Sequence, residues 1–186
     1  MLGLIAWLGL SMAWLGAAVL VLSEARRGLA VGLLLAAAGL AVVRFAEGDA
    51  ADAGLLLAGG LLASVIALRR NPRRGWGLLP AGSTPRIVLS IVVGGAALWL
   101  GVAALDSPGE PQARAAATIV MALGAGRLLG VRDPRAALAA ASLIALGAGT
   151  LEALATTDAT GALIGSIAAV ALNLIPAAAD SEAEGG

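Results

Sequence analysis

The sequence contains no cysteine, histidine, lysine or tyrosine, and only 13% of its 186 residues are charged. The missing residue types exclude disulfides, thiolate and imidazole metal ligands, serine–histidine and cysteine–histidine catalysis, and lysine Schiff bases. The 12 basic and 12 acidic residues cancel, so no bulk charge attracts nucleic acid. Because an enzyme would have to work with Asp, Glu and Arg alone, we expect neither catalysis nor a cofactor.

Apolar residues are abundant instead. They make up 60% of the chain, and the mean hydropathy is +0.95. Soluble domains average about 45–50% apolar and about 25% charged residues. This chain therefore lacks the polar side chains that would cover a surface facing water, and its composition predicts an integral membrane protein.

Apolar runs of near-membrane length lie between clusters of charged residues. A helix needs about 20 mainly apolar residues to cross the hydrocarbon core of a bilayer. The runs are rich in the helix formers Ala and Leu and lack the alternation of β-barrel strands. The expected fold is an all-α bundle of transmembrane helices in one domain, residues 1–179, followed by a short acidic tail, residues 180–186. The seven expected helices cover residues 2–22, 28–43, 53–68, 87–105, 115–130, 136–154 and 161–178.

Arginines are distributed unequally between the two sides of this expected bundle. Ten of the 12 lie near the connections that follow the first, third and fifth helices, and only Arg44 and Arg114 lie on the other side. Cytoplasmic loops of membrane proteins collect basic residues. We therefore expect a plasma-membrane protein with its N-terminus outside and its C-terminus in the cytoplasm. The outer side carries the acidic residues Glu47, Asp49, Asp52, Asp106, Glu110, Glu152 and Asp158.

Two short patterns indicate an internal repeat. Residues 70–73 and 132–135 both read Arg-(Asn or Asp)-Pro-Arg, which we interpret as the exit of a helix because proline cannot continue one. The acidic turn around residues 47–52 also resembles the turn around residues 152–158. These patterns favour three tandem helical hairpins, with the first helix added in front. The alternative is coincidence in a chain rich in Ala, Leu, Gly and Arg.

Small residues recur at four-residue spacing in most of the expected helices. Lipid provides no hydrophobic force between helices, so residues that let two backbones approach closely determine which surfaces pack. We expect these stripes to form contacts between helices, and homodimerisation is the alternative use. The glycines chosen as helix-packing residues are Gly28, Gly32, Gly126, Gly130, Gly161 and Gly165.

Three charged or amide side chains lie inside the expected helices, where such groups are costly. Arg127 lies about one turn from the end of the fifth helix. It either reaches lipid headgroups or pairs, as a buried cation, with a carbonyl or an anionic group. Glu152 is expected to meet water near the outer surface, with Arg44 or Arg114 as alternative partners. Asn173 is expected to hydrogen-bond to another helix, a contact worth on the order of 1 kcal/mol.

The longest connection joins the third and fourth helices on the arginine-rich side. Its composition is typical of a segment that contacts an anionic membrane surface, and docking of a partner is the alternative. The residues concerned are Arg69, Arg70, Arg73, Arg74, Trp76 and Arg86. The outer carboxylates match no metal-binding loop, so no metal is expected.

The expected helices carry no ionisable group near their centres with which to draw a proton relay. The sequence therefore favours a non-catalytic membrane protein, an accessory or structural component that acts through contacts within the bilayer, with a partner or with a second copy. The alternative is a transporter of small solutes or lipids whose path is lined by Arg127 and Asn173. A shared interior cavity for these two side chains would favour transport.

Overall fold

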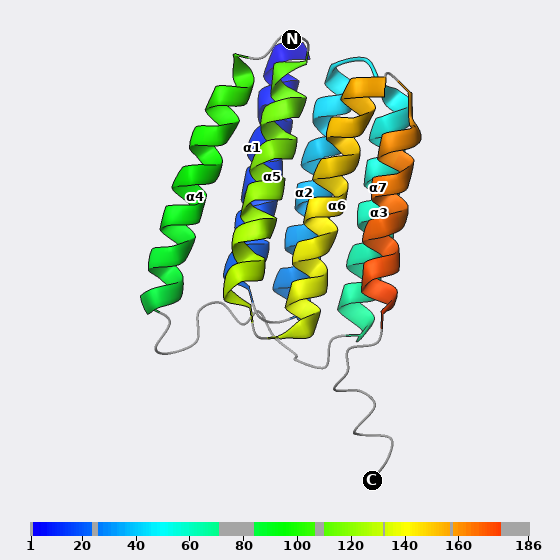
Figure 1. The fold of residues 1–186 in the computed structure, drawn as a ribbon. Helices are drawn as coiled ribbons and strands as arrows, with labels where there is room; N and C mark the ends of the chain where they lie inside the picture. Colours follow the sequence, from blue (N-terminus) through cyan, green and yellow to red (C-terminus); the bar gives the residue numbers. More distant parts are fainter. Residues whose placement is uncertain are drawn as a thin grey trace.

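The computed structural model describes residues 2–23, 26–70, 84–106, 110–131, 133–156 and 158–175, with side chains except at residues 26, 70 and 84–90. The described residues form seven helices that run alternately up and down the bundle, so that α1 starts and α7 finishes at opposite ends (Figure 1). The helices are α1 (Leu2–Leu22), α2 (Arg26–Ala46), α3 (Ala50–Arg70), α4 (Thr84–Leu105), α5 (Pro111–Gly130), α6 (Pro134–Thr156) and α7 (Thr160–Leu174).

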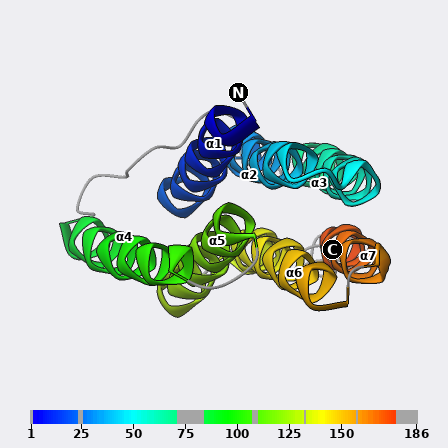
Figure 2. The same ribbon diagram turned by 90° about the horizontal axis from the view of Figure 1, so that it is seen from above.

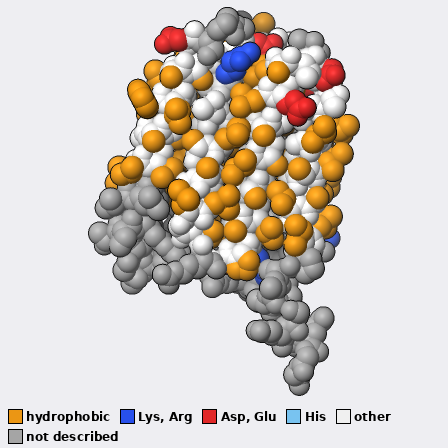
Figure 3. Space-filling view, in the orientation of Figure 1, with side chains coloured by type: hydrophobic (Ala, Val, Ile, Leu, Met, Phe, Trp, Pro, Cys, Tyr) orange, Lys and Arg blue, Asp and Glu red, His pale blue; other side chains and the backbone are white. Residues whose placement is uncertain are grey.

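Five of these helices, α1, α2, α3, α5 and α6, are long and apolar enough to cross a membrane. The described apolar part of α4, Ile91–Leu105, and helix α7 are shorter. Apolar side chains are spread over the length of the described surface visible in Figure 3, while acidic side chains gather at one end. The expectation of an all-helical fold with several membrane-length apolar helices is confirmed.

Helices α2 to α6 all extend beyond the apolar runs that predicted them. The last turn of α2 includes Arg44, the first turn of α3 includes Asp52, and α5 begins at Pro111. Arg44 and Asp52 fit inside helices because their side chains pair with each other. Proline fits at the start of α5 because the first turn of a helix needs no backbone N–H donor.

The proline in residues 132–135 indicated the end of a helix, but in the structure this proline begins one. Helix α5 already ends at Gly130, and α6 begins at Pro134. Asp133 accepts a hydrogen bond from the backbone N–H of Arg135 at 3.0 Å, which is the geometry of an N-cap. Asp-Pro therefore starts α6. In the other copy of the pattern, residues 71–73 lie outside the described residues.

The helices form two layers. Helices α1, α2 and α3 lie side by side in one layer, and α5, α6 and α7 follow in the same order in the other (Figure 2). Across the layers, α1 contacts α5, α2 contacts α5 and α6, and α3 contacts α7. Helix α4 lies at the edge of the second layer and packs mainly on α5. Helices in equivalent positions of the two layers, such as α1 and α5, run in the same direction (Figure 1).

Helices α1 and α2 pack against each other in the same register as helices α5 and α6 do. Gly39 of α2 lies against the backbone of Ala13 in α1. Gly147, 108 residues after Gly39, lies against Met121 in α5, which is 108 residues after Ala13. The helix starts follow the same spacing to within two residues.

A second contact follows the same offset. Gly16 of α1 lies against Ala36 of α2, and Gly124 of α5 lies against Ile144 of α6. Helices α1–α3 and α5–α7 are therefore two copies of one arrangement, which we call the first and the second unit. Helix α1 is not an addition to a row of hairpins, because it has an equivalent in α5.

The glycines expected at helix contacts lie at or near them. A Cβ atom would come within 3.0 Å of a neighbouring helix at Gly32, Gly126, Gly161 and Gly165. Gly28 is buried, and Gly130 is the last residue of α5. Small residues thus allow α1 to approach α2, α4 to approach α5, and α6 to approach α7.

We expect Gly16→Ala to destabilise the protein, because a Cβ atom at Gly16 would lie 2.2 Å from the backbone nitrogen of Ala36. Moving α1 and α2 apart should lower the free energy of unfolding by about 1–3 kcal/mol. Thermal unfolding in a mild detergent measures this effect. Gly3→Ala in the same helix is the control, because no atom lies within 4 Å of that Cβ position. Equal stability of the two variants would contradict the contact between α1 and α2.

Candidate functional site

The turn between α2 and α3 is built from two helix caps. At the end of α2, the backbone N–H of Asp49 donates to the carbonyl of Arg44 at 3.0 Å, and that of Gly48 donates to Phe45 at 3.1 Å. Gly48 has a φ of 101°, which glycine adopts without strain. Asp49 then caps α3 by accepting the N–H of Asp52 at 3.3 Å. The two caps bring the side chains of Arg44, Asp49 and Asp52 together.

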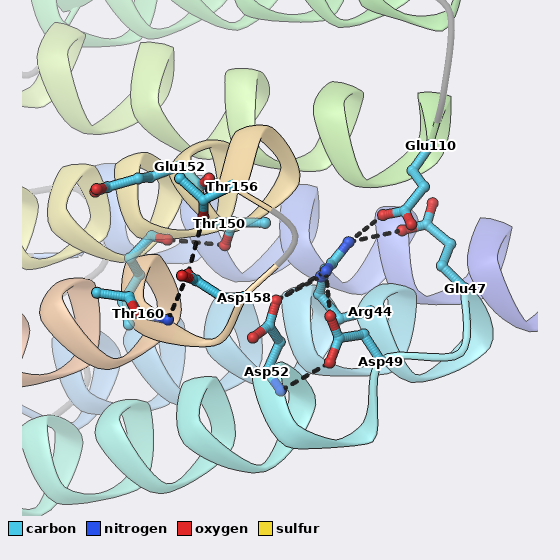
Figure 4. A network of polar contacts seen from close by, with 11 residues as sticks. Arg44, Glu47, Asp49, Asp52, Glu110, Thr150, Glu152, Thr156, Asp158 and Thr160 are labelled. Carbon is cyan, nitrogen blue, oxygen red and sulfur yellow. Dashed lines mark hydrogen bonds and ion pairs between the residues drawn. The ribbon is translucent and has the colours of Figure 1, made fainter.

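Arg44 is only 2% exposed and lies among carboxylates (Figure 4). Its Nε and Nη2 both donate to Oδ2 of Asp52, at 3.2 and 2.8 Å. Nη2 also donates to Oδ2 of Asp49 at 2.7 Å. Asp52 is fully buried, so the ion pair removes both charges from water together. Such burial is tolerated because each charge has a hydrogen-bonded partner of opposite sign.

A further partner of Arg44 comes from the start of the second unit. Glu110, directly before α5, bonds to Nη1 of Arg44 and makes no side-chain cap on its own helix. Glu47 supplies that cap, because its Oε1 accepts the backbone N–H of Ala113 at 3.2 Å. Its Oε2 lies 3.7 Å from Nη1 of Arg44. These bonds fasten the α2–α3 turn to the start of α5.

Four carboxylates thus surround one guanidinium, in a group that we call the arginine cluster: Arg44, Glu47, Asp49, Asp52 and Glu110. Burial, together with the neighbouring carboxylate of Glu110, raises the pKa of Glu47 to about 7, although the N–H of Ala113 and the charge of Arg44 oppose the rise. The cluster can therefore take up and release a proton near neutral pH. Among the described residues, no group of three or more acidic side chains is arranged to hold a metal ion.

Arg127 lies in the last turn of α5, at the end of the bundle opposite the arginine cluster, and is 8% exposed. Its Nη2 donates to the backbone carbonyl of Ser23, directly after α1, at 2.9 Å. The sequence left two roles open for Arg127. The structure shows the second, a buried cation that pairs with a carbonyl. The bond satisfies an acceptor at the C-terminal end of α1, where the helix dipole favours a positive charge.

Asn173 links α7 to α6. Its Nδ2 donates to Oγ of Ser142 at 2.8 Å and to the carbonyl of Ala169 at 2.9 Å. Ser142 also donates to the carbonyl of Leu138 at 2.8 Å. Asn173 is buried, so its amide is used in packing contacts between two helices.

The structure does not bring the expected intramembrane residues into one site. Arg127 binds the end of α1, whereas Asn173 binds α6. Glu152 is exposed in α6. Arg44 pairs with the carboxylates of the arginine cluster instead of with Glu152.

The residues expected to contact a membrane surface or a partner are described only in part. Arg69 is exposed near the end of α3. The side chains of Arg70 and Arg86 lie outside the described residues, and so do the whole of Arg73, Arg74 and Trp76. Their proposed contact with an anionic surface stays a prediction.

The sequence did not single out the arginine cluster, although it contains a signal for it. Arg44 counts there only as one of two arginines on the acidic side. An arginine that continues an apolar helix needs a partner. Glu47 follows three residues later, and Asp52 follows after a short turn. Glu110 carries no such signal, because only the packing of α5 beside α2 places it near Arg44.

Compared with known proteins, the chain matches no family model, no curated protein and no solved structure. Its function is therefore inferred from its own residues.

We expect Arg44→Gln to lower the free energy of unfolding by about 3 kcal/mol, because it leaves the buried carboxylate of Asp52 without its cation. The double variant Arg44→Leu, Asp52→Leu should recover part of this loss, since apolar residues often replace a buried ion pair at little cost. Thermal unfolding of the single and double variants in detergent measures both effects. A single variant as stable as the parent protein would show that the pair does not hold the turn.

We expect Arg127→Ala to destabilise the bundle, because it removes a charged hydrogen bond to the carbonyl of Ser23. The loss of unfolding free energy should be about 1.5–3 kcal/mol. Arg69→Ala is the matched control, because Arg69 is exposed near the same end of the bundle. If both variants unfold at the same temperature, Arg127 does not stabilise the contact between α5 and the end of α1.

Proposed function

We propose that the chain is an integral membrane protein in which all seven helices cross the bilayer. The five long apolar helices support this proposal, and so does the alternating direction of the helices. Ten of the 12 arginines lie toward one side of the expected topology, which favours a cytoplasmic location for that side in a plasma membrane. The N-terminus would then lie outside and the C-terminus in the cytoplasm.

We further propose that the protein acts without catalysis, as an accessory or structural component of a membrane assembly. The observation that carries this proposal is the use of Arg127 and Asn173 in separate packing contacts. A transport path lined by both residues would require them to meet, and their different partners argue against it. The glycine contacts between neighbouring helices also favour a packed interior over a path.

Helix α4 is the part of the bundle best suited to contact a membrane partner. It packs mainly on α5, at the edge of one layer. Its outward side chains are large, apolar and exposed, and Trp99 is 74% exposed. In the described part of α4, the exposed large apolar residues are Ile91, Val92, Leu98, Trp99, Leu100 and Val102.

The test is the composition of the protein complex extracted from its native membrane. We expect native mass spectrometry in a mild detergent to show a second polypeptide in fixed stoichiometry with the tagged chain. Trp99→Ala should reduce the amount of that polypeptide at least about tenfold, a loss of about 1.4 kcal/mol in binding. Leu129→Ala, at an exposed apolar position of α5, is the control. A chain that elutes alone or only with copies of itself would contradict the proposed accessory role.

A further inference from the structure

Two bonds hold the start of α5 to the end of α2, and in each of them a carboxylate next to one helix bonds to the other helix. Glu110 precedes α5 but bonds to Arg44, at the end of α2. Glu47, which follows α2, caps α5 at Ala113. Figure 4 shows the carboxylates of Glu47 and Glu110 side by side next to the guanidinium. The two units are thus joined at this end through two carboxylates that lie close to each other.

The charges around these two carboxylates do not balance. Arg44 from α2 is the cation of the cluster, and it faces Glu47, Asp49, Asp52 and Glu110. Helices α1 and α7 contain no ionisable residue. At this end of the bundle, the other charged side chains of the described neighbouring elements are Asp106 directly after α4, Arg114 in α5, Glu152 in α6 and Asp158 before α7. Two carboxylates beside the same guanidinium nitrogen repel each other unless one of them holds a proton.

The geometry provides a place for that proton. Oε2 of Glu47 is buried and has no hydrogen-bond partner, while Oε1 is occupied by the N–H of Ala113. A proton on Oε2 would let Glu47 donate to the carboxylate of Glu110. The side chain of Glu110 is 40% exposed, so water can deliver and remove the proton.

We propose that the arginine cluster is a proton-controlled latch between the two units. A proton held between Glu47 and Glu110 fastens the start of α5 to the α2–α3 turn. Loss of the proton releases Glu110 and the start of α5 from the α2–α3 turn. Asp49 and Asp52 keep Arg44 in place in both states, because their three hydrogen bonds to it do not involve Glu110. This proposal does not depend on the protein having a membrane partner.

The pH range follows from Glu47, whose pKa is raised from an ordinary value of 4.5 to about 7 in the closed arrangement. When the latch opens and Glu47 meets water, its pKa falls toward the ordinary value. The closed state therefore binds more protons than the open state and is favoured at low pH. Its advantage is complete below pH 4.5 and is lost as the pH rises through about 7.

The absence of cysteine allows two spin labels to be placed without a background. The labels go on Ala51→Cys at the start of α3 and Ala103→Cys near the end of α4, both exposed positions at the same end of the bundle as the latch. Pulsed electron paramagnetic resonance in lipid nanodiscs measures their separation at about pH 5.5 and about pH 8.5. We expect a narrow distance distribution at low pH and a broader, longer one at high pH, with a midpoint near 7.

Two variants and a control separate the latch from general effects of pH. Glu47→Gln keeps the acceptor for Ala113 and a donor for Glu110, so its distribution should stay narrow at both pH values. Glu110→Gln removes the neighbouring charge and should lower the midpoint by at least about one pH unit. Glu152→Gln changes an exposed carboxylate of α6 and should leave the transition unchanged. An unchanged distance in the parent protein, or a pH transition that persists in Glu47→Gln, would overturn the proposal.

Discussion

Close contact between helix backbones is the constraint on which this bundle depends. A membrane offers no hydrophobic force that draws apolar helices together, so they associate where small side chains let many atoms touch. At Gly16 and Gly39, α1 and α2 approach so closely that a single added methyl group would meet backbone atoms. The same requirement recurs between α6 and α7 at Gly149 and Gly165. The large side chains on the outside of the bundle can vary in shape without disturbing this packing, but these positions cannot.

Buried polar groups then determine how the two units sit against each other. Contacts between small residues are weakly directional, whereas a guanidinium requires acceptors in particular places. Arg44 joins the first unit to Glu110, and Arg127 of the second unit binds the carbonyl of Ser23 in the first. Because the two arginines lie at opposite ends of the bundle, they hold α5 at both its start and its finish. Helix α5 is therefore bonded to the first unit at both of its ends.

The helical fold was predictable because membrane-length apolar runs leave few other structures possible. The helix ends were not, since Arg44 continues a helix only by virtue of partners, and Glu110 lies 66 residues away in the sequence. The repeat of α1–α3 in α5–α7 could not be recognised in the sequence either. What recurs is the position of close contacts and not the side chains, since Ala13 corresponds to Met121. Arg127 and Asn173 were recognisable as unusual residues, but their separate partners depend on how distant helices pack.

The presence of α4 follows from the parity of the repeat. A unit of three helices starts at one end of the bundle and finishes at the other, so two such units with the same direction cannot be joined by a short loop. One additional helix must return the chain, and α4 does so at the edge of the second layer. Helix α4 belongs to neither unit, so its length and hydropathy matter more than the exact shape of its outward side chains. The open space around Gly94 and Gly95 shows this freedom. The side of α4 that faces away from α5 can thus change in sequence without disturbing the packing of the two units.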